Sequence, residues 1–296
     1  MLSILIPFYN YDVRALVLEL HKQCLECKID FEILVQDDAS ESVHNIKNEQ
    51  INTLSQCSFV SLQQNIAHRE NRNLLARHAK FDYLLFIDGD SNCLNPSYIV
   101  DFVFAMHRFD VVYGGRLHPI NCPSKNHILR WKYGKFREDK VACLRKKAPF
   151  INLLFNNTVI RKAVFESIKF DASFKKYGHD DTQFSFELSK KNISVLHIDN
   201  QIEHGDIDFS SDYLNKTKQA VENLYQFYKQ NSIDYKFIKI LKFYHVVRIL
   251  KIKKIIVMIF NSIEPELKKQ LLGSNPHLSL FDFYKIGYLC TLDANN

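Results

Sequence analysis

Several patterns that would mark other classes of protein are missing from this chain of 296 residues. It contains no run of roughly 18 uncharged apolar residues, so we expect no membrane-spanning helix. No basic segment precedes the apolar start, and that run stops at Pro7, so we expect no signal peptide. No zinc-finger, RNP-like or helix-turn-helix pattern accompanies the net charge of +6. We therefore expect no nucleic-acid partner.

The cysteines also lack the pattern of a secreted disulfide framework. There are 7 of them, an odd number scattered along a long chain, which favours a reducing compartment and a cytoplasmic location. Cys24 and Cys27 form a C-x-x-C, but no second pair follows, and residues 15–28 have the pattern of a helix between two strands. We expect packed, reduced thiols.

What is present is the composition of an ordinary folded protein, with 46% hydrophobic and 24% charged residues. Runs typical of β-strands at 2–6, 31–36, 58–62 and 83–87 alternate with segments of helical period. This alternation predicts an α/β protein whose largely parallel sheet is covered on both faces, with a ligand site at the carboxyl ends of the strands.

Polar residues follow each of these four runs. They are Tyr9 and Asn10, Asp37 and Asp38, Asn65, and Asp88 and Asp90. The last two carboxylates are separated only by Gly89, and they would repel each other unless a cation or strong hydrogen-bond donors lie beside them. A metal ion is one candidate. The alternatives are a cap or turn at Asp38, a turn at 88–90, and a solvated helix face for 65–73.

The order of these pieces resembles a known family. "SILIPFYN", "ILVQDDAS", "NIAHRENRN" and "FIDGDS", followed by "FNNTVIRKAVFESIKFDASFKKYGHDDTQFSFEL" at 155–188, resemble the inverting family-two glycosyltransferases with the GT-A fold. The resemblance covers about the first 205 residues. It implies a Rossmann-like, mostly parallel central sheet flanked by helices in a catalytic domain over 1–208. The remainder, 209–296, has no counterpart in the resemblance, and the i, i+4 apolar spacing of "SSDYLNKTKQAVENLYQFYKQN" predicts a helical C-terminal region. Within the catalytic domain, 1–115 would be the donor half and 116–208 the acceptor half.

The resemblance also implies roles for the donor side of the site. Pro7, Tyr9 and Asn10 match the loop against the nucleotide, and Asn65 lies at the same edge. Asp38 matches the residue that hydrogen-bonds the uracil ring, and Arg72 matches the basic residue beside the phosphates.

The metal would lie at the D-x-D element. Asp88, Gly89 and Asp90 match the segment that holds the divalent ion and the donor ribose, and His204 is similar to the later histidine that completes the metal site. Carboxylate ligands suit Mn²⁺ or Mg²⁺, and a histidine ligand favours Mn²⁺.

The acceptor side would be served by the last acids of "GHDD". Asp181 matches the general base, and Asp180 matches an acceptor-contacting residue that is usually glutamate in the family. Mutual repulsion could raise the pKa of one of them, which would make it a better base. The alternative is that they cap a helix beginning near Thr182. Ala67 also departs from the resemblance, because a glycine is common at its position.

Two further segments carry open interpretations. The cation-rich stretch 114–147 is predicted to be a long loop over the cleft, in which Arg116 and His118 could contact a diphosphate or an acceptor. Trp131 could stack on a sugar or anchor a core. Residues 240–260 form either a helix packed on the catalytic domain or a basic amphipathic segment on an anionic membrane.

Taken together, the sequence predicts a metal-dependent glycosyltransferase. The donor would be a UDP-sugar and the acceptor a glycan or lipid-linked saccharide, with inversion, in surface polysaccharide synthesis. Peripheral contact with the inner face of the membrane would use 240–260. One alternative is a phosphohydrolase, because "DGDSN" distantly resembles the nucleophile loop of haloacid-dehalogenase-like enzymes. The other is a non-catalytic relative that binds nucleotide sugars.

Overall fold

A computed structural model describes residues 1–173 and 176–294, which form two compact units. The first unit comprises Met1–His118, Asp139–Lys175 and Asp180–Asp206, and the second comprises Pro119–Glu138, Lys176–His179 and Ile207–Asn296. The chain passes between the units several times. The division predicted at residue 208 stays a prediction.

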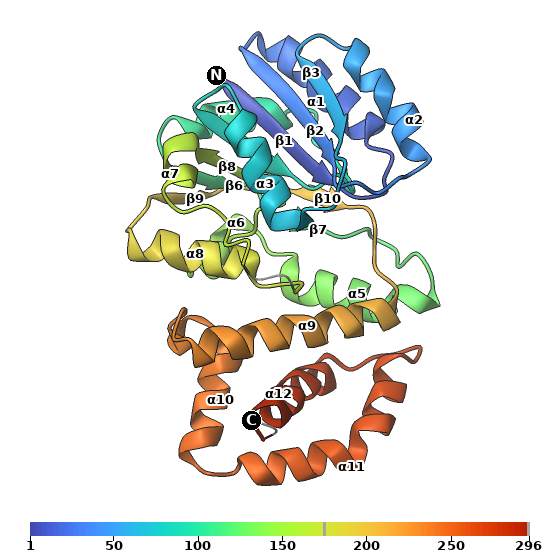
Figure 1. Cartoon of the computed structure of the whole chain (residues 1–296), viewed down its shortest axis with the longest axis vertical. Helices are drawn as coiled ribbons and strands as arrows, with labels where there is room; N and C mark the ends of the chain where they lie inside the picture. Colours follow the sequence, from blue (N-terminus) through green and yellow to red (C-terminus); the bar gives the residue numbers. More distant parts are fainter. Residues whose placement is uncertain (174–175, 295–296) are drawn as a thin grey trace. The chain divides into compact units, whose positions relative to one another are not determined.

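The first unit is built on a seven-stranded sheet with the order β3-β2-β1-β4-β8-β6-β9 (Figure 1). Its strands are β1 (Leu2–Phe8), β2 (Phe31–Asp37), β3 (Cys57–Ser61), β4 (Tyr83–Ile87), β6 (Val111–Tyr113), β8 (Asn157–Arg161) and β9 (Val195–His197). The strands β3, β2, β1 and β4 are parallel, as are β6 and β9, whereas β8 runs antiparallel to both of its neighbours. The predicted α/β fold with a mostly parallel central sheet is confirmed.

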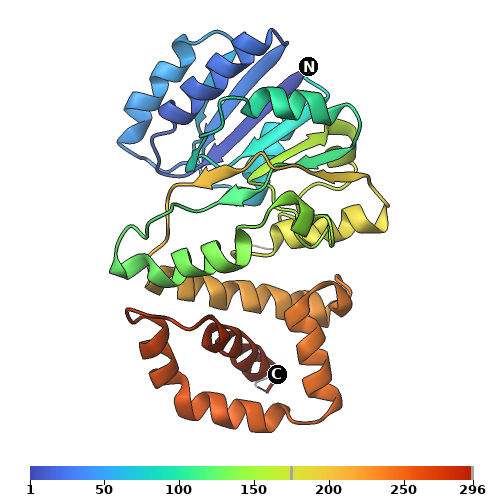
Figure 2. The same ribbon diagram turned by 180° about the vertical axis from the view of Figure 1, so that it is seen from behind.

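Both faces of this sheet are buried, which explains why its strands are apolar at nearly every position. Ile4 and Ile6 pack in a core with α1 and α4, whereas the intervening Leu5 packs with α3 on the other face. Leu84 and Leu85 divide between the two cores in the same way. The helix α3 lies in front of the sheet in Figure 1, and α4 lies in front of it in Figure 2. Side chains of a strand alternate between faces, so a doubly covered strand needs apolar residues on both.

The helices of the first unit connect these strands. They are α1 (Arg14–Cys27), α2 (His44–Asn48), the 3₁₀ helix η1 (Glu49–Thr53), α3 (Ala67–His78), α4 (Tyr98–Met106), α6 (Ala142–Arg145), α7 (Lys162–Glu166) and α8 (Asp180–Lys190). The helix predicted over 15–28 is α1, and it ends at Lys28 in the left-handed conformation. All seven cysteines are free, and Cys24 is buried in the core that α1 shares with the sheet. Burial raises the pKa of Cys24 well above its usual range, as expected for a packed thiol.

A second, three-stranded sheet brings a distant histidine to the end of β4. Its order is β5-β10-β7, from β5 (Ser91–Asn92), β10 (Ile202–His204) and β7 (Arg116–Leu117). His204 pairs with Ser91, and the Gly205 N–H donates to the Asp90 carbonyl at 2.8 Å. The backbone therefore places His204 beside Asp90, more than 100 residues away in the sequence.

The long loop predicted over 114–147 is wrong, because most of this stretch is regular structure. It contains β7, the 3₁₀ helix η2 (Lys125–His127), α5 (Ile128–Tyr133), a π-helical turn η3 (Gly134–Glu138) and α6. The reason is that its cations are internal donors. Arg145 is buried and donates to the carbonyls of Gly114 and Ile198 at 3.0 and 2.5 Å. The Trp131 indole N–H donates to the Pro119 carbonyl at 2.8 Å, which ties it to its own unit.

The second unit is helical. Besides η2, α5 and η3 it contains α9 (Ser210–Lys229), η4 (Tyr235–Phe237), α10 (Lys239–Ile249), α11 (Lys253–Leu271) and α12 (Leu278–Ala294). α12 contacts α9, α10 and α11 (Figure 1). The core of this unit consists of Leu129, Leu214, Phe260, Leu267, Leu271, Phe281 and Tyr284.

The segment 240–260 is two helices rather than one. Lys251 lies between α10 and α11 with φ of 56°, and its N–H donates to the Arg248 carbonyl at 3.1 Å. The Ile252 N–H donates to the Val247 carbonyl, so the end of α10 is closed by a left-handed residue. Within residues 1–173 and 176–294, no helix is long and apolar enough to cross a membrane.

Candidate active site

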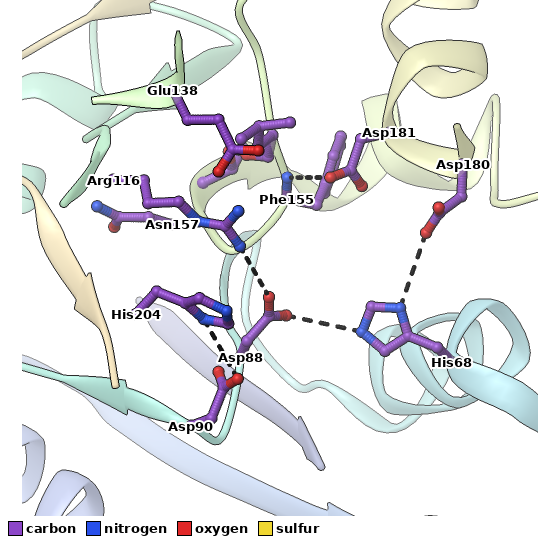
Figure 3. Close-up of polar contacts among 12 residues, drawn as sticks. His68, Asp88, Asp90, Arg116, Glu138, Phe155, Asn157, Asp180, Asp181 and His204 are labelled. Atoms are coloured by element: carbon purple, nitrogen blue, oxygen red, sulfur yellow. Dashed lines mark hydrogen bonds and ion pairs between the residues drawn. The ribbon is translucent and has the colours of Figure 1, made fainter. Parts of the chain in front are cut away.

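The "FIDGDS" segment turns at the end of β4, and its glycine is required by packing. The Gly89 N–H donates to the Pro7 carbonyl at 3.3 Å, and a β-carbon at Gly89 would lie 2.5 Å from Cβ of Phe8. Only glycine lets the loop cross the end of β1 this closely. Figure 3 shows the flanking carboxylates diverging, with Asp88 directed toward Arg116 and His68 and Asp90 toward His204. The two acids thus avoid each other by facing different partners.

Arg72 joins the two halves of the site. Its side chain is 2% exposed, and it donates from Nη2 to Asp88 Oδ1 at 2.8 Å and from Nη1 to Asp181 Oδ1 at 3.0 Å. One guanidinium on α3 therefore links the end of β4 to the first turn of α8. Burial alone would raise the pKa of Asp88, but the Arg72 charge, with His68 and Arg116, holds it well below the usual range. The solvated helix face considered for 65–73 is wrong at Arg72, because this side chain is buried by its carboxylate partners.

His68 is a site residue that the sequence did not reveal. Its ring nitrogens lie 3.6 Å from Asp88 Oδ1 and 3.7 Å from Asp180 Oδ2, so it bridges a second pair of acids (Figure 3). Burial and the Arg72 charge oppose protonation of His68, but the neighbouring carboxylates of Asp180 and Asp88 outweigh both and raise its pKa to about 9. The available signal was its position four residues before Arg72, which places both on one face of α3.

The two adjacent acids occupy the first turn of α8, which begins at Asp180. The helix expected near Thr182 is therefore present, but it begins two residues earlier, so the two acids lie inside its first turn and not before it. Asp181 Oδ2 accepts the Phe155 N–H at 3.2 Å, while its Oδ1 accepts from Arg72. Burial, together with the charges of Asp180 and Asp88, raises the pKa of Asp181 despite Arg72. Burial would also raise the pKa of Asp180, but His68 and Arg72 hold it below its usual range. The two adjacent acids therefore have pKa values shifted in opposite directions.

Asp90 and His204 form the second pair at the end of β4. His204 Nδ1 lies 3.2 Å from Asp90 Oδ2, and the rings of His204 and His118 meet edge to face at 5.7 Å between centroids. His118, one of the candidates for ligand contact, is 2% exposed and its Nδ1 lies 2.6 Å from Asp139 Oδ1. It therefore lies behind His204, in contact with it. Arg116 lies closer to the acids, with Nη2 at 4.0 Å from Asp88 Oδ2.

The residues at this pair suit a divalent cation that receives its other ligands from a substrate. Across the described part of the chain, no cluster of three or more His, Cys, Asp and Glu side chains is arranged to hold a metal by itself. Among the same residues, however, Asp90 Oδ1 and His204 Nδ1 are buried without a hydrogen-bond partner. Within these described residues, His204 Nδ1 lies beside Asp90 Oδ2 without forming a hydrogen bond, and Asp90 Oδ1 has no partner, so a carboxylate and an imidazole nitrogen lie side by side as possible ligands for an ion such as Mn²⁺. Asp88 is engaged by Arg72, and the predicted trio of Asp88, Asp90 and His204 stays a prediction.

The predicted nucleotide loop begins later than expected. Pro7 lies inside β1 and is buried, so the loop starts at Tyr9, which is 61% exposed, and at Asn10, with φ of 55°. A short amide side chain tolerates that left-handed conformation.

Asp38 lies at the adjacent strand end. Its Oδ1 accepts the Ile66 N–H at 2.8 Å, and Asn65 donates to its carbonyl at 3.0 Å. Burial raises the pKa of Asp38 although the N–H groups of Ile66 and Ala67 lower it. Asp38 therefore binds a free backbone N–H group, as the capping interpretation predicted. That hydrogen bond uses Oδ1 and not Oδ2.

A cavity of about 380 Å³ opens beside α8. It is lined by one face of that helix, through Asp180, Gln183 and Glu187, and by the segment after α7, including Lys169 and Asp171. The volume lies within the usual range for small-molecule sites.

A mostly parallel sheet flanked by helices, with acids gathered at the carboxyl ends of its strands, places this protein among the GT-A glycosyltransferases. The profile of Glycosyl transferase family 2 matches residues 3–168, and the chain belongs to that family. No curated protein matches the chain.

Solved structures agree on the fold. The S. aureus TarS 1–349 structure is 19% identical, with a TM-score of 0.51 over 74% of this chain. The same TarS fragment in complex with UDP gives the same values, and its complex with UDP-GlcNAc is 18% identical over 74% of this chain, with a TM-score of 0.50. This chain covers 64% of the fragment in the first two structures and 65% in the third, and 39% of a longer TarS structure. At these identities the likeness shows the fold alone.

Proposed function

We propose that this protein transfers a sugar from a nucleotide sugar, a UDP-sugar, to a hydroxyl of a glycan or lipid-linked saccharide, with inversion, in surface polysaccharide synthesis. The observation that carries the proposal is the Arg72 bridge, because it holds a donor-side acid and an acceptor-side acid on one buried guanidinium. Transfer needs both acids around a single anomeric carbon.

The donor would lie across the ends of β1, β2 and β4. An exposed aromatic ring at Tyr9 and the carboxylate of Asp38 suit a nucleobase with an imide N–H. The S. aureus TarS structures with UDP and UDP-GlcNAc support this choice of donor for the same fold. Asn10 and Asn65 would complete the loop against the nucleotide.

Asp90 and His204, with Asp88, would hold a Mn²⁺ or Mg²⁺ ion, and the imidazole ligand favours Mn²⁺. When bound, the ion would neutralise negative charge on the diphosphate leaving group. Arg72 and Arg116, which lie at the two oxygens of Asp88, would add fixed positive charge. These side chains would orient the diphosphate without further protein rearrangement.

Asp181 would remove the proton from the acceptor hydroxyl as it attacks the anomeric carbon from the face opposite the leaving group. Its raised pKa suits a base, and the Phe155 N–H fixes one of its oxygens. Asp180, anionic beside His68, would hydrogen-bond an acceptor hydroxyl, and the adjoining cavity has room for a sugar.

The phosphohydrolase alternative is disfavoured by the same contacts. A carboxylate nucleophile must be free to attack phosphorus, whereas Asp88 is bound by Arg72 at 2.8 Å. Family membership also favours the transferase. A non-catalytic binding protein would not require the raised pKa of Asp181.

The test is to incubate the protein with Mn²⁺, a panel of UDP-sugars and saccharide acceptors, and to measure UDP release together with the anomeric configuration of the product by NMR. We expect one UDP-sugar to be consumed and the anomeric centre to be inverted. Retention, or nucleotide binding without turnover on any acceptor, would contradict the proposal. Mn²⁺ affinity in the presence of UDP should fall at least tenfold in His204→Gln and stay unchanged in His277→Gln, which alters an exposed histidine of the second unit.

A further inference from the structure

The helix α10 carries apolar side chains on its outer face. Its buried face consists of Leu241, Tyr244 and Val247. The exposed residues recur at spacings of three and four, and they are Phe243 (55%), Val246 (47%), Ile249 (64%) and the following Leu250 (59%). Such spacing places them on one stripe of the helix. A surface helix ordinarily presents charged or polar side chains there.

The helix α11 also exposes apolar side chains on its outer face. Phe260, Leu267 and Leu271 face the core of the unit. A second stripe is exposed, formed by Ile255 (53%), Met258 (64%), Ile259 (43%) and Ile263 (38%). The two stripes follow each other along the chain across the corner at Lys251. An apolar surface of this kind marks an interaction site.

The charge of the segment is of one sign. From 236 to 263 the sequence contains seven lysine and arginine residues and no aspartate or glutamate. Lys253 forms an ion pair with Asp293, with 2.7 Å between Nζ and Oδ2. The others are exposed, and they are Lys236, Lys239, Lys242, Arg248, Lys251 and Lys254.

We propose that the α10–α11 corner binds the surface of an anionic lipid bilayer, with its apolar stripes in the boundary between headgroups and acyl chains and its lysines on the headgroups. Both components of interfacial binding are present, namely buried apolar area and electrostatic attraction. Lysine is depleted in protein–protein interfaces, so the excess of lysine over 236–263 favours lipid over a protein partner. This surface lies wholly in the second unit, and the inference does not depend on the transfer reaction.

The test is co-sedimentation of the full chain with vesicles of phosphatidylcholine alone or with one third phosphatidylglycerol. We expect binding to the anionic vesicles that weakens with added salt, and little binding to the neutral ones. Replacing three cations by Lys239→Gln, Lys242→Gln and Lys254→Gln should weaken partition onto anionic vesicles by roughly 100-fold. The matched control, Lys146→Gln, Lys147→Gln and Lys191→Gln, removes three exposed cations of the first unit and should leave binding unchanged.

The apolar stripes are tested separately. Phe243→Ser, Ile249→Ser and Met258→Ser together should weaken binding more than tenfold, because the salt-insensitive part of the attraction is lost. Val43→Ser with Ile46→Ser, at positions that are 76% and 79% exposed in the first unit, should have no effect. Thermal melting will show that each variant is folded.

Two results would overturn the proposal. The first is that wild-type protein does not sediment with anionic vesicles at low salt. The second is that it forms a dimer by light scattering which the triple serine variant converts to monomer, since a second copy of the chain would then be the occupant. Insertion has its own readout, because brominated lipids should quench the added emission of Phe243→Trp.

Discussion

The first unit contains two pairs of adjacent aspartates, and their surroundings differ. Asp37 accepts from neutral groups, namely the Ser40 N–H at 3.0 Å, Asn45 Nδ2 at 2.8 Å and Ser61 Oγ at 2.8 Å. Asp180, in the other pair, faces the cationic side chains of His68 and Arg72. In each pair one acid has a lowered pKa and its neighbour a raised one.

The two pairs differ in whether the groups that contact them also contact residues elsewhere in the site. The donors around Asp37 belong to its own loop and neighbouring strand, so this pair fixes the shape of the β2 end. The cations around Asp180 and Asp181 also bind Asp88, 92 or more positions away in the sequence. Any ligand that changes the charge at Asp88 therefore changes the electrostatic environment of the acceptor-side acids. The contacts of Asp37 are local, whereas those of Asp180 and Asp181 are shared with Asp88, the acid of the proposed donor site.

The largest effect expected from this comparison is on the rate of transfer. Asp181→Asn removes the proposed base and should lower kcat about 10³-fold, within the range for general-base catalysis, with UDP affinity unchanged. Steady-state UDP release and UDP titration measure the two quantities. Asp180→Asn should instead raise the acceptor KM. If the two substitutions have equal effects on kcat, the assignment of separate roles is wrong.

Arg72 is the residue on which the second pair depends. Arg72→Leu leaves three partly buried carboxylates without their cation and should lower the free energy of unfolding by about 3 kcal/mol at pH 7. The deficit should shrink toward pH 4. In the wild type, the stabilisation from the lowered pKa values of Asp88 and Asp180 is present above their unfolded pKa of about 3.9 and is lost only as pH falls below it, so it is intact at pH 4.5. In the variant, protonation relieves the penalty.

Urea unfolding at pH 7 and pH 4.5 measures both effects of the Arg72 substitution. The control is Arg77→Gln, which breaks an exposed pair with Glu70 and should cost less than about 1 kcal/mol. A deficit that grows as the pH falls would contradict the electrostatic explanation.

His197 extends the comparison to a buried histidine whose ring contacts a guanidinium and a backbone carbonyl. Its Nδ1 accepts from Arg145 Nε at 3.3 Å, and Nε2 lies 3.0 Å from the Pro149 carbonyl. Burial lowers its pKa to about 4. Its contribution to stability is therefore present above the unfolded pKa of about 6.5 and is lost as pH falls toward 4, roughly 2 kcal/mol by pH 4.5.

Unfolding free energies at pH 7, 5.5 and 4.5 test this prediction for His197. His197→Gln should be less stable at pH 7 and should lose less stability on acidification than the wild type. His277→Gln, at an exposed position, should follow the wild-type curve. Parallel curves for His197→Gln and the wild type would show that this histidine does not titrate as proposed.

A smaller effect, on UDP affinity, is expected at the Asp37–Asp38 pair. Asp38→Asn keeps an oxygen for the Ile66 N–H but removes the charge offered to a uracil imide, so UDP affinity should fall about tenfold. Calorimetric titration with UDP and GDP measures the change, and the preference for UDP should decrease. An unchanged affinity would remove Asp38 from the base-recognition site while leaving its capping role intact.

The sequence was sufficient to predict the sheet and the acids at its edge. Apolar runs with sharp ends mark parallel strands, and such strands bring their carboxyl ends together whatever the loops do. The four predicted strands each lie within two residues of β1, β2, β3 and β4.

Other features depended on contacts that no local pattern contains. The bridge from His68 and Arg72 to α8 joins residues more than 100 positions apart. Arg145 lies in the stretch that was expected to be a long loop, yet it is buried and donates to the carbonyls of Gly114 and Ile198, which are 31 and 53 positions away in the sequence. The break in 240–260 follows from the left-handed Lys251, a conformation that its residue type does not favour.

The smallest predicted effect is on stability, at Ala67, which follows the residue whose N–H donates to Asp38. Ala67, where the resembling family commonly has glycine, has φ of 66°. A β-carbon in this left-handed region costs about 1 kcal/mol or more, which glycine would relieve. Glycine also makes the unfolded chain more flexible, and this favours unfolding and offsets part of the relief. Ala67→Gly should therefore stabilise the protein by about 0.5 kcal/mol. Ala76→Gly, in the interior of the same helix, should destabilise it by about 1 kcal/mol or more. Thermal melting of the pair measures the sign. If both substitutions lower the melting temperature equally, the left-handed backbone at Ala67 carries no strain, and this position accepts alanine as readily as glycine.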